Sequence, residues 1–155
     1  MSADLDKFAR DGHLKHQKIL EIKKEFEILF DSERSSMGSI GIGWAEILIA
    51  GLRNIKHLVE TSGCTDYPKI TAIKEKFADL RIYLSFYPLT DDARTEEDVS
   101  EVASAVAQMY TNIMKQIDGK CELCGKDGNA VGRHWIRTLC PEHAQEQEEL
   151  ENHDE

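Results

Sequence analysis

Three cysteines and one histidine near the C-terminal end of the sequence have the spacing of a metal site. Cys121 and Cys124 form a C-x2-C pair, and after 15 intervening residues Cys140 and His143 form a C-x2-H pair. Three thiolates and one imidazole are a common ligand set for structural zinc, and each short spacing lets one turn direct two ligands to the same ion. In a cytoplasmic protein this pattern favours metal over disulfides. The sequence therefore predicts one structural Zn²⁺ per chain, bound by these four residues.

A site with four protein ligands leaves no open coordination position, which argues against zinc-dependent hydrolysis. His134 is the open alternative, because it could replace His143 or serve as the base of a small nuclease of the ββα-metal type. Such nucleases need separate ligands for a catalytic metal, and no matching set of histidine and asparagine residues follows His134. A redox role for Cys121 and Cys124 would need a thioredoxin-like βαβ pattern, which the surrounding sequence lacks. We therefore interpret His134 as an ordinary hairpin residue and do not expect an enzyme.

Nucleic-acid binding through the same segment is a second alternative. It requires Arg133, Trp135 and Arg137 to share an exposed face. Residues 119–143 carry only one net positive charge, which is a weak footprint for contacts with phosphates. We interpret Trp135 as packing against its apolar neighbours, so nucleic acid is not the expected partner.

Other residues that could carry chemistry form weaker patterns. Cys64, next to Gly63, could be a nucleophile, but an inert loop thiol is the simpler interpretation. His13 and His16 lie three residues apart and could share a metal, but a solvated helix face is the simpler interpretation. A modest basic group, interpreted as a solvated face of a predicted hairpin, comprises Lys69, Lys74, Lys76 and Arg81.

The elements that must position the cysteines are mostly helices. Apolar residues at helical spacing predict helices over about 4–31, 43–61 and 95–118, the first of them weakened near Gly12. Residues 32–42 between the first two are expected to form a loop, because their irregular glycines fit no phosphate-binding motif.

Residues 70–87 fit two patterns. Their first half matches a helix, whereas Leu80, Ile82, Leu84 and Phe86 alternate as in a strand. Because β-branched and aromatic residues dominate, we expect a β-hairpin with strands at about 70–77 and 80–87 and a turn at Ala78-Asp79. The predicted fold class is α+β, mostly helical, with this hairpin and a small C-terminal Cys3His zinc-binding module.

Charge and composition define three regions. We expect a helical and hairpin core over residues 1–118, the zinc-binding module over 119–144, and an acidic, disordered tail over 145–155, with a last short helix beginning near Pro141. The net charge is −10, and most of it lies in residues 91–101 and in the tail. These acidic stretches favour solubility and helix-end chemistry, with Thr95 as a helix cap; a surface for a basic partner is the alternative.

Targeting signals are not apparent in the sequence. It contains no apolar run of about 18 residues, as a membrane span requires, and its N-terminal stretch lacks the apolar core of a signal peptide. We therefore expect a cytoplasmic protein with no membrane partner.

Three motifs follow one another in the second half of the chain, with Gly43-Trp44 upstream of them. They are IKEKFADLRIY (73–83), CELCG (121–125) and WIRTLCPEHA (135–144). Over roughly residues 43–144 the chain resembles a family of small, mostly uncharacterised phage and bacterial proteins that read V-K-E-K-F-G-G-L-R-F-Y, C-E-x-C-G and W-x-x-T-L-C-x-x-H-A. The resemblance implies a zinc-binding module on the same four ligands. It also supports the hairpin, since family members have Gly-Gly where this chain has Ala78-Asp79.

Together these observations predict a non-enzymatic, zinc-stabilised protein-interaction module. The phage association of the family implies an accessory protein that binds and modulates a host protein, such as a defence or transcription component, in the cytoplasm of the bacterial host. The apolar stripe of residues 4–31 could dock on that partner or on a second copy in a homodimer, and core packing within one subunit explains it equally well. The identity of the protein partner is not encoded in any motif.

Overall fold

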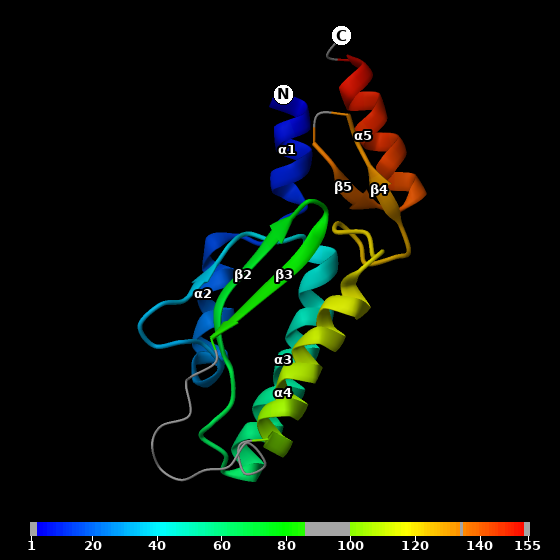
Figure 1. The fold of residues 1–155 in the computed structure, drawn as a ribbon. Coiled ribbons are helices and arrows are strands. Elements are labelled where there is room, and N and C mark those ends of the chain that lie inside the picture. Colours follow the sequence, from blue (N-terminus) through cyan, green and yellow to red (C-terminus); the bar gives the residue numbers. More distant parts are fainter. Residues whose placement is uncertain (1–2, 86–99, 134, 154–155) are drawn as a thin grey trace.

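The computed structural model of the chain describes residues 3–85, 100–133 and 135–153. These residues form an elongated α+β molecule in which two long helices lie beside a small sheet and a hairpin with its own helix occupies one end (Figure 1). In chain order the elements are α1 (Ala3–Asp11), α2 (His16–Glu25), the 3-10 helix η1 (Glu27–Leu29), β1 (Ser36–Met37), α3 (Ile42–Ser62), β2 (Lys69–Lys76), β3 (Asp79–Ser85), α4 (Ser100–Ile117), β4 (Asn129–Val131), β5 (Arg137–Leu139) and α5 (Pro141–His153). The predicted fold class, with a hairpin and a C-terminal Cys3His cluster, is confirmed.

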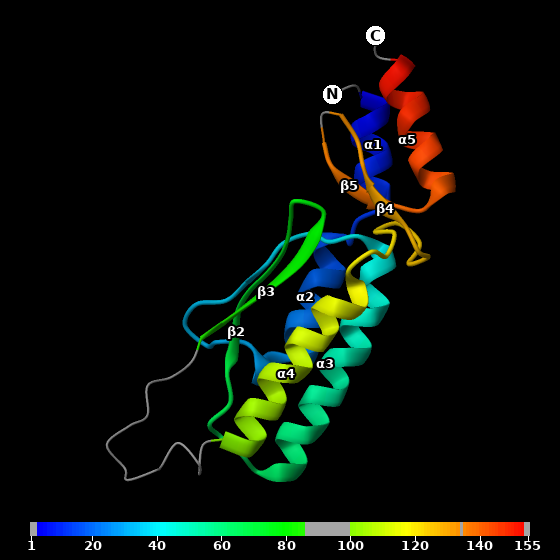
Figure 2. The same ribbon diagram turned by 45° about the vertical axis from the view of Figure 1, so that its right-hand side comes forward.

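The main core lies between the long helices, α2 and the sheet. α3 and α4 run antiparallel and β3 packs against α4 (Figure 2). Apolar side chains recur at helical spacing on both helices, so each presents one continuous stripe to the core. The buried residues of these stripes are Trp44, Leu48, Leu52, Ile55 and Val59 from α3 and Val106, Tyr110, Ile113 and Ile117 from α4. Within the described ranges, no helix is long and apolar enough to cross a membrane.

The hairpin of β2 and β3 turns one residue earlier than the sequence predicted. Lys76 pairs with Asp79, so the turn residues are Phe77 (φ 51°) and Ala78 (φ 66°) rather than Ala78 and Asp79. Two central residues with positive φ define the turn type that matches the twist of a two-residue hairpin. The position is fixed by a tertiary contact, because the Thr138 hydroxyl donates a 2.9 Å hydrogen bond to the carbonyl of Ala78. Parallel pairing of β1 with β2 completes the sheet, so the predicted loop at 32–42 contains a short strand.

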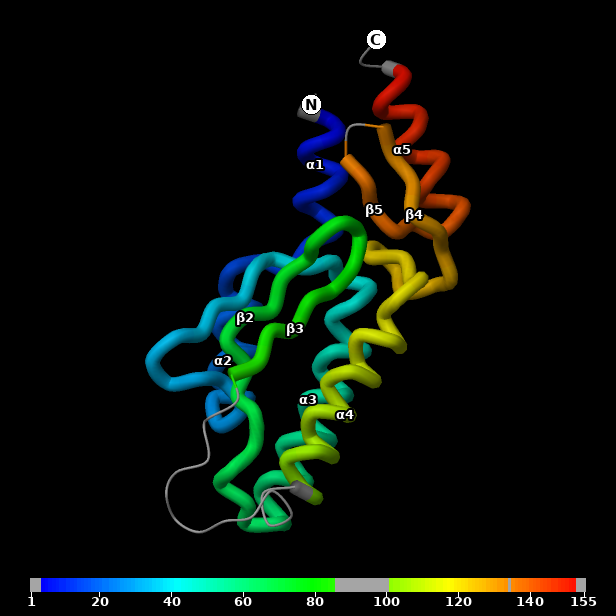
Figure 3. Tube along the Cα trace, viewed as in Figure 1, coloured from blue at the N-terminus to red at the C-terminus, as the bar shows by residue number. Residues whose placement is uncertain are grey.

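The continuous helix expected over residues 4–31 is wrong, because the chain breaks between α1 and α2. Gly12 lies at the break, and a Cβ at this position would overlap the side chain of Leu123 in the C-terminal part of the chain. Backbone groups at and after the break form hydrogen bonds with residues 40–42 instead of within a helix. Leu14 N donates to Ile40 O over 2.9 Å, and Gly12 O accepts from Ile42 N over 2.7 Å. The break lets α1 leave the main core and lie beside α5 (Figure 3).

The acidic tail expected to be disordered over 145–155 is helical as far as His153. Its helix is held by two buried side chains one turn apart, Gln147 and Glu151. Gln147 donates to the backbone carbonyl of Trp135, and Glu151 accepts from Arg133. Composition alone could not predict this helix, because its stability comes from contacts with the preceding hairpin.

Several predicted features lie outside the described residues. They are the Thr95 cap, the last predicted strand residues at 86–87, most of the acidic segment at 91–101, and His134.

Replacement of Phe77 by glycine should stabilise the protein. A left-handed conformation costs an L-residue about 1–2 kcal/mol, and glycine avoids this cost at some loss of chain entropy. Phe77 is 80% exposed, so little apolar burial is lost. We expect the free energy of unfolding in urea to rise by about 0.5–1 kcal/mol. Phe77→Ala is the control, because its Cβ keeps the strain; an equal gain in that variant would contradict the explanation.

Candidate functional site

The four predicted metal ligands come together where the C-x2-C loop (residues 121–125) meets the start of α5. The Sγ atom of Cys121 lies 3.4 Å from Nδ1 of His143, and the Sγ atom of Cys140 lies 3.2 Å from the same nitrogen. The Sγ atoms of Cys124 and Cys140 are 3.7 Å apart. All four potential ligand atoms lie within 4.8 Å of one another, so the cluster could hold a metal ion.

Local backbone geometry explains why each pair of ligands converges. In the first pair, Gly125 has a φ of 80°, and its N–H donates to the carbonyl of Cys121 over 2.8 Å, which closes a tight turn. In the second pair, Cys140 immediately precedes α5 and His143 lies in the first helical turn. Burial by itself raises the pKa of the Cys140 thiol. Hydrogen bonds from the backbone N–H groups of His143 and Glu142 and from the neighbouring thiols lower it by more, so the pKa lies below its ordinary value.

The C-x2-C loop docks against the first turn of α3 through close backbone contacts. Gly43 N donates to Glu122 O over 2.8 Å, and the indole Nε1 of Trp44 donates to Lys120 O over 2.8 Å. A Cβ at Gly43 would lie 2.7 Å from Cys124 N and closer still to two other backbone atoms of the loop. The Gly-Trp pair noted in the sequence therefore has a physical role: the glycine admits the loop and the tryptophan bonds to it.

Behind this loop lies a fully buried ion pair that the sequence analysis missed. Arg137 donates through Nε to Oε1 of Glu122, and both side chains are inaccessible to solvent. The guanidinium of Arg137 stacks 4.6 Å from the ring of Trp135 and 5.2 Å from that of Phe8. Burial raises the pKa of Glu122 above its ordinary value, and the charge of Arg137 opposes this. A signal was present in the motifs, since this glutamate lies between the two cysteines of C-E-x-C-G.

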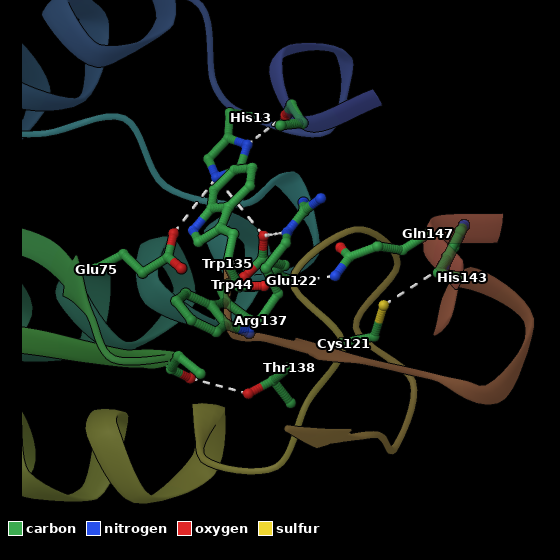
Figure 4. A network of polar contacts seen from close by, with 12 residues as sticks. His13, Trp44, Glu75, Cys121, Glu122, Trp135, Arg137, Thr138, His143 and Gln147 are labelled. Atoms are coloured by element: carbon green, nitrogen blue, oxygen red, sulfur yellow. Dashed lines mark hydrogen bonds and ion pairs between the residues drawn. The ribbon is translucent and has the colours of Figure 1, made fainter. Parts of the chain in front are cut away.

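Three further side chains join the pair in what we term the buried network (His13, Glu75, Glu122, Trp135 and Arg137; Figure 4). Nδ1 of His13 donates to the carbonyl of Ala9, and its Nε2 lies 3.4 Å from Oε2 of Glu75 and 3.7 Å from Oε1 of Glu122. The ring of His13 stacks on Trp135 with centroids 6.1 Å apart. Burial lowers the pKa of His13, but Glu75, the Ala9 carbonyl and Glu122 outweigh it and raise the pKa above its ordinary value.

A groove of about 920 Å³ opens beside the buried network, between the α1–α2 connection, the hairpin tip and the segment before β5. Its apolar residues include Leu14, Phe77, Trp135 and Ile136, and its cationic residues are Arg10, Lys15 and Lys74. Phe77 and Ile136 are 80% and 54% exposed. The groove thus combines apolar surface with positive charge in a protein whose net charge is −10.

The alternative sites of the sequence analysis fall in other places. Cys64 follows Gly63, the residue that ends α3, whereas the C-x2-C loop docks on the first turn of that helix. His13 approaches Glu75 and Glu122, whereas His16 lines the groove without joining that cluster.

The surface required for nucleic-acid binding is not formed by the described residues. Arg137 is buried and paired with Glu122, so it cannot share an exposed face with Arg133. Arg133 instead bonds to Glu151 and to Asn152 of α5. Of the predicted basic group, Lys74 lines the groove, while Lys69 lies over the ring of Tyr67 at 3.7 Å.

Substitution of Gly43 by alanine should destabilise the protein, although alanine is ordinarily about 1 kcal/mol better than glycine in a helix. The added Cβ would collide with backbone atoms of the C-x2-C loop, and the loop cannot yield without losing its contacts with α3. We expect a loss of about 2–3 kcal/mol in the free energy of unfolding. Gly38→Ala is the matched control, because its nearest neighbour, Cβ of Lys74, lies at an ordinary 3.6 Å. A Gly43→Ala protein as stable as the parent would contradict the docking.

Comparison of the chain with protein-family models, with curated proteins and with solved structures gave no match. The family resemblance indicated by the three motifs therefore stays a prediction. Function has to be inferred from the cysteine cluster, the buried network and the groove themselves.

Proposed function

We propose that this protein is a non-enzymatic, zinc-stabilised interaction module whose groove binds an acidic, apolar segment of a partner protein. In keeping with the phage family that its motifs resemble, the proposed partner is a host protein that the module modulates. The observation that carries the proposal is Phe77, an exposed aromatic residue held in a strained conformation at the edge of the groove.

The geometry of the cysteine cluster supports zinc as the stabilising ion. Two thiolates bound to one zinc at about 2.3 Å in a tetrahedron lie about 3.8 Å apart, and a thiolate and an imidazole nitrogen about 3.6 Å apart. The corresponding separations here are 3.7 Å for Cys124 and Cys140, and 3.4 and 3.2 Å from Cys121 and Cys140 to His143. Cys121, Cys124, Cys140 and His143 would fill all four positions, so the ion would supply folding free energy rather than chemistry.

The strain at Phe77 supports a binding role for the groove. Glycine or asparagine is the usual residue where φ is positive, and a bulky residue there is a genuine outlier. Such strain is found where a function requires the side chain, since stability alone would remove it. Phe77 contributes little to the core, because most of its surface faces solvent. Together with Ile136 it offers apolar surface for a partner.

The positive charge of the groove indicates that the bound segment is acidic. Three cations, Arg10, Lys15 and Lys74, line the groove together with one carboxylate, Glu75. An acidic segment with an apolar side chain would complement both the positive charge and the exposed apolar surface. A basic segment would be repelled by the same cations. The groove therefore favours an acidic partner, whereas the acidic stretches of the chain would attract a basic one.

Loss of a cysteine ligand should remove zinc and unfold the C-terminal part. For Cys140→Ser we expect the metal content to fall from one zinc per chain to none and the free energy of unfolding to fall by more than about 3 kcal/mol. Hydrogen exchange should show residues 119–144 losing protection while much of α3 and α4 keeps it. Cys64→Ser is the control and should retain zinc and stability. An unchanged melting temperature in Cys140→Ser would rule out a structural zinc.

The partner-binding role is tested with the protein purified from its natural host and analysed by native mass spectrometry. We expect a retained host protein that dissociates from a Phe77→Ser/Ile136→Ser variant, with the affinity lowered by about tenfold or more. Leu20→Ser is the matched control, because Leu20 is a similarly exposed apolar residue, on α2. Crosslinking should map the bound segment as acidic. A partner that survives the double substitution, or one held through a basic segment, would contradict the proposed groove.

A further inference from the structure

Three potential metal ligands from distant parts of the chain meet at the inner edge of the groove. They are His13 from the α1–α2 connection, Glu75 from β2 and Glu122 from the C-x2-C loop, and one donor atom from each lies within 4.8 Å of the other two. We propose that these residues form a second divalent-cation site, distinct from the cysteine cluster and suited to an ion that prefers carboxylate oxygens, such as Mn²⁺. The site does not depend on the proposed partner.

The separations fit shared coordination better than hydrogen bonding. Nε2 of His13 lies 3.4 Å from Oε2 of Glu75 and 3.7 Å from Oε1 of Glu122. A charge-assisted N–H···O bond spans about 2.7–2.9 Å, so a proton on Nε2 would satisfy neither carboxylate well. Two ligands bound to one ion at about 2.1 Å lie about 3.4 Å apart at a tetrahedral angle and about 3.0 Å apart at the octahedral angle that Mn²⁺ prefers. The three donors would therefore move together by up to about 0.7 Å around Mn²⁺.

His13 is oriented as a metal ligand commonly is. A carbonyl oxygen can only accept a hydrogen bond, so the Nδ1 atom that contacts Ala9 O carries a proton. In the neutral ring this leaves the lone pair on Nε2, which faces the two carboxylates. A backbone carbonyl that fixes the tautomer in this way is the usual outer partner of a ligating histidine.

Glu122 has one carboxylate oxygen that remains open to coordination. Its side chain is fully buried, and its Oε2 atom has no hydrogen-bond partner. Its Oε1 atom, the one near His13, accepts from Nε of Arg137, whose two Nη atoms also lack hydrogen-bond partners among the described residues. A buried carboxylate oxygen without a partner carries a large desolvation cost, which coordination to a cation would remove. The cluster is nonetheless reachable, because His13 and Glu75 both line the groove.

Arg137 sets the expected affinity. Its guanidinium pairs with Glu122, so with His13 neutral the charges of Glu75, Glu122 and Arg137 sum to −1. Binding of a divalent ion changes the summed charge of the site from −1 to +1. Because the ion is then not fully neutralised, we expect weaker binding here than at the three-thiolate cluster. Ligand type also separates the two sites, because the two carboxylates suit Mn²⁺, whereas thiolates select zinc.

Titration of the zinc-loaded, full-length protein with Mn²⁺, followed by electron paramagnetic resonance of the free ion, tests the proposal. We expect one Mn²⁺ to bind per chain without release of zinc. The conservative substitutions His13→Gln and Glu75→Gln should each weaken Mn²⁺ binding by about tenfold or more, because each removes a ligand. Neither residue belongs to the cysteine cluster, so both variants should keep their zinc. The zinc content then serves as the check that the C-terminal part is still folded.

His16→Gln is the matched control, since His16 lines the same groove but lies outside the cluster. It should bind Mn²⁺ as the parent does. Absence of Mn²⁺ binding at millimolar concentration would overturn the proposal and leave His13 as a protonated partner of the two glutamates. Binding that Glu75→Gln leaves unchanged, or that His16→Gln weakens equally, would also overturn it, since the ion would then lie elsewhere.

Discussion

The end of the molecule that contains the cysteine cluster and the groove depends on one close contact between two backbone segments. These are the C-x2-C loop and the first turn of α3. Gly41 and Gly43 lie at the contact, and a Cβ on either would overlap backbone atoms of the loop. Because no side chain intervenes, Gly43 N reaches Glu122 O and the indole of Trp44 reaches Lys120 O. The loop that carries two of the four potential metal ligands is thereby packed directly against the main core.

That approach has an energetic consequence for the side chain between the two cysteines. Once the loop is docked, Glu122 points into the interior, where an isolated carboxylate would cost several kcal/mol. Arg137 supplies the opposite charge from β5, and the adjacent Thr138 bonds to the hairpin tip. Such pairs contribute little net stability, but removing either partner is costly. The pair therefore serves to fix how β5 lies against the loop and the hairpin.

The sequence predicted those features that depend on periodicity and ligand spacing. The stripes of α3 and α4, the hairpin and the four cysteine-cluster ligands were readable because each follows a local rule of spacing. The break at Gly12, the helical tail and the turn at Phe77 were not, because each is decided by a contact distant in sequence. The side chain of Leu123 occupies the space beside Gly12, Arg133 and Trp135 hold the tail, and Thr138 fixes the turn.

The same distant contacts explain why the groove and the buried network escaped sequence analysis. His13, Glu75 and Glu122 are separated by more than forty residues at each step, and no motif links them. They meet because α1 leaves the main core at Gly12, because the hairpin tip is held by Thr138, and because the C-x2-C loop docks on α3.

Two walls of the groove therefore depend on the C-terminal part: the hairpin tip, held through Thr138, and the segment that carries Trp135 and Ile136. If the cysteine cluster holds the proposed ion, loss of that ion would release the segment carrying Trp135 and Ile136 together with Thr138, the partner of Ala78. The hairpin tip would then lose the contact that holds Phe77 against the groove. In this way an ion that takes no part in binding would still determine whether the groove keeps its shape. These contacts are the physical link between the closed cysteine cluster and the open groove.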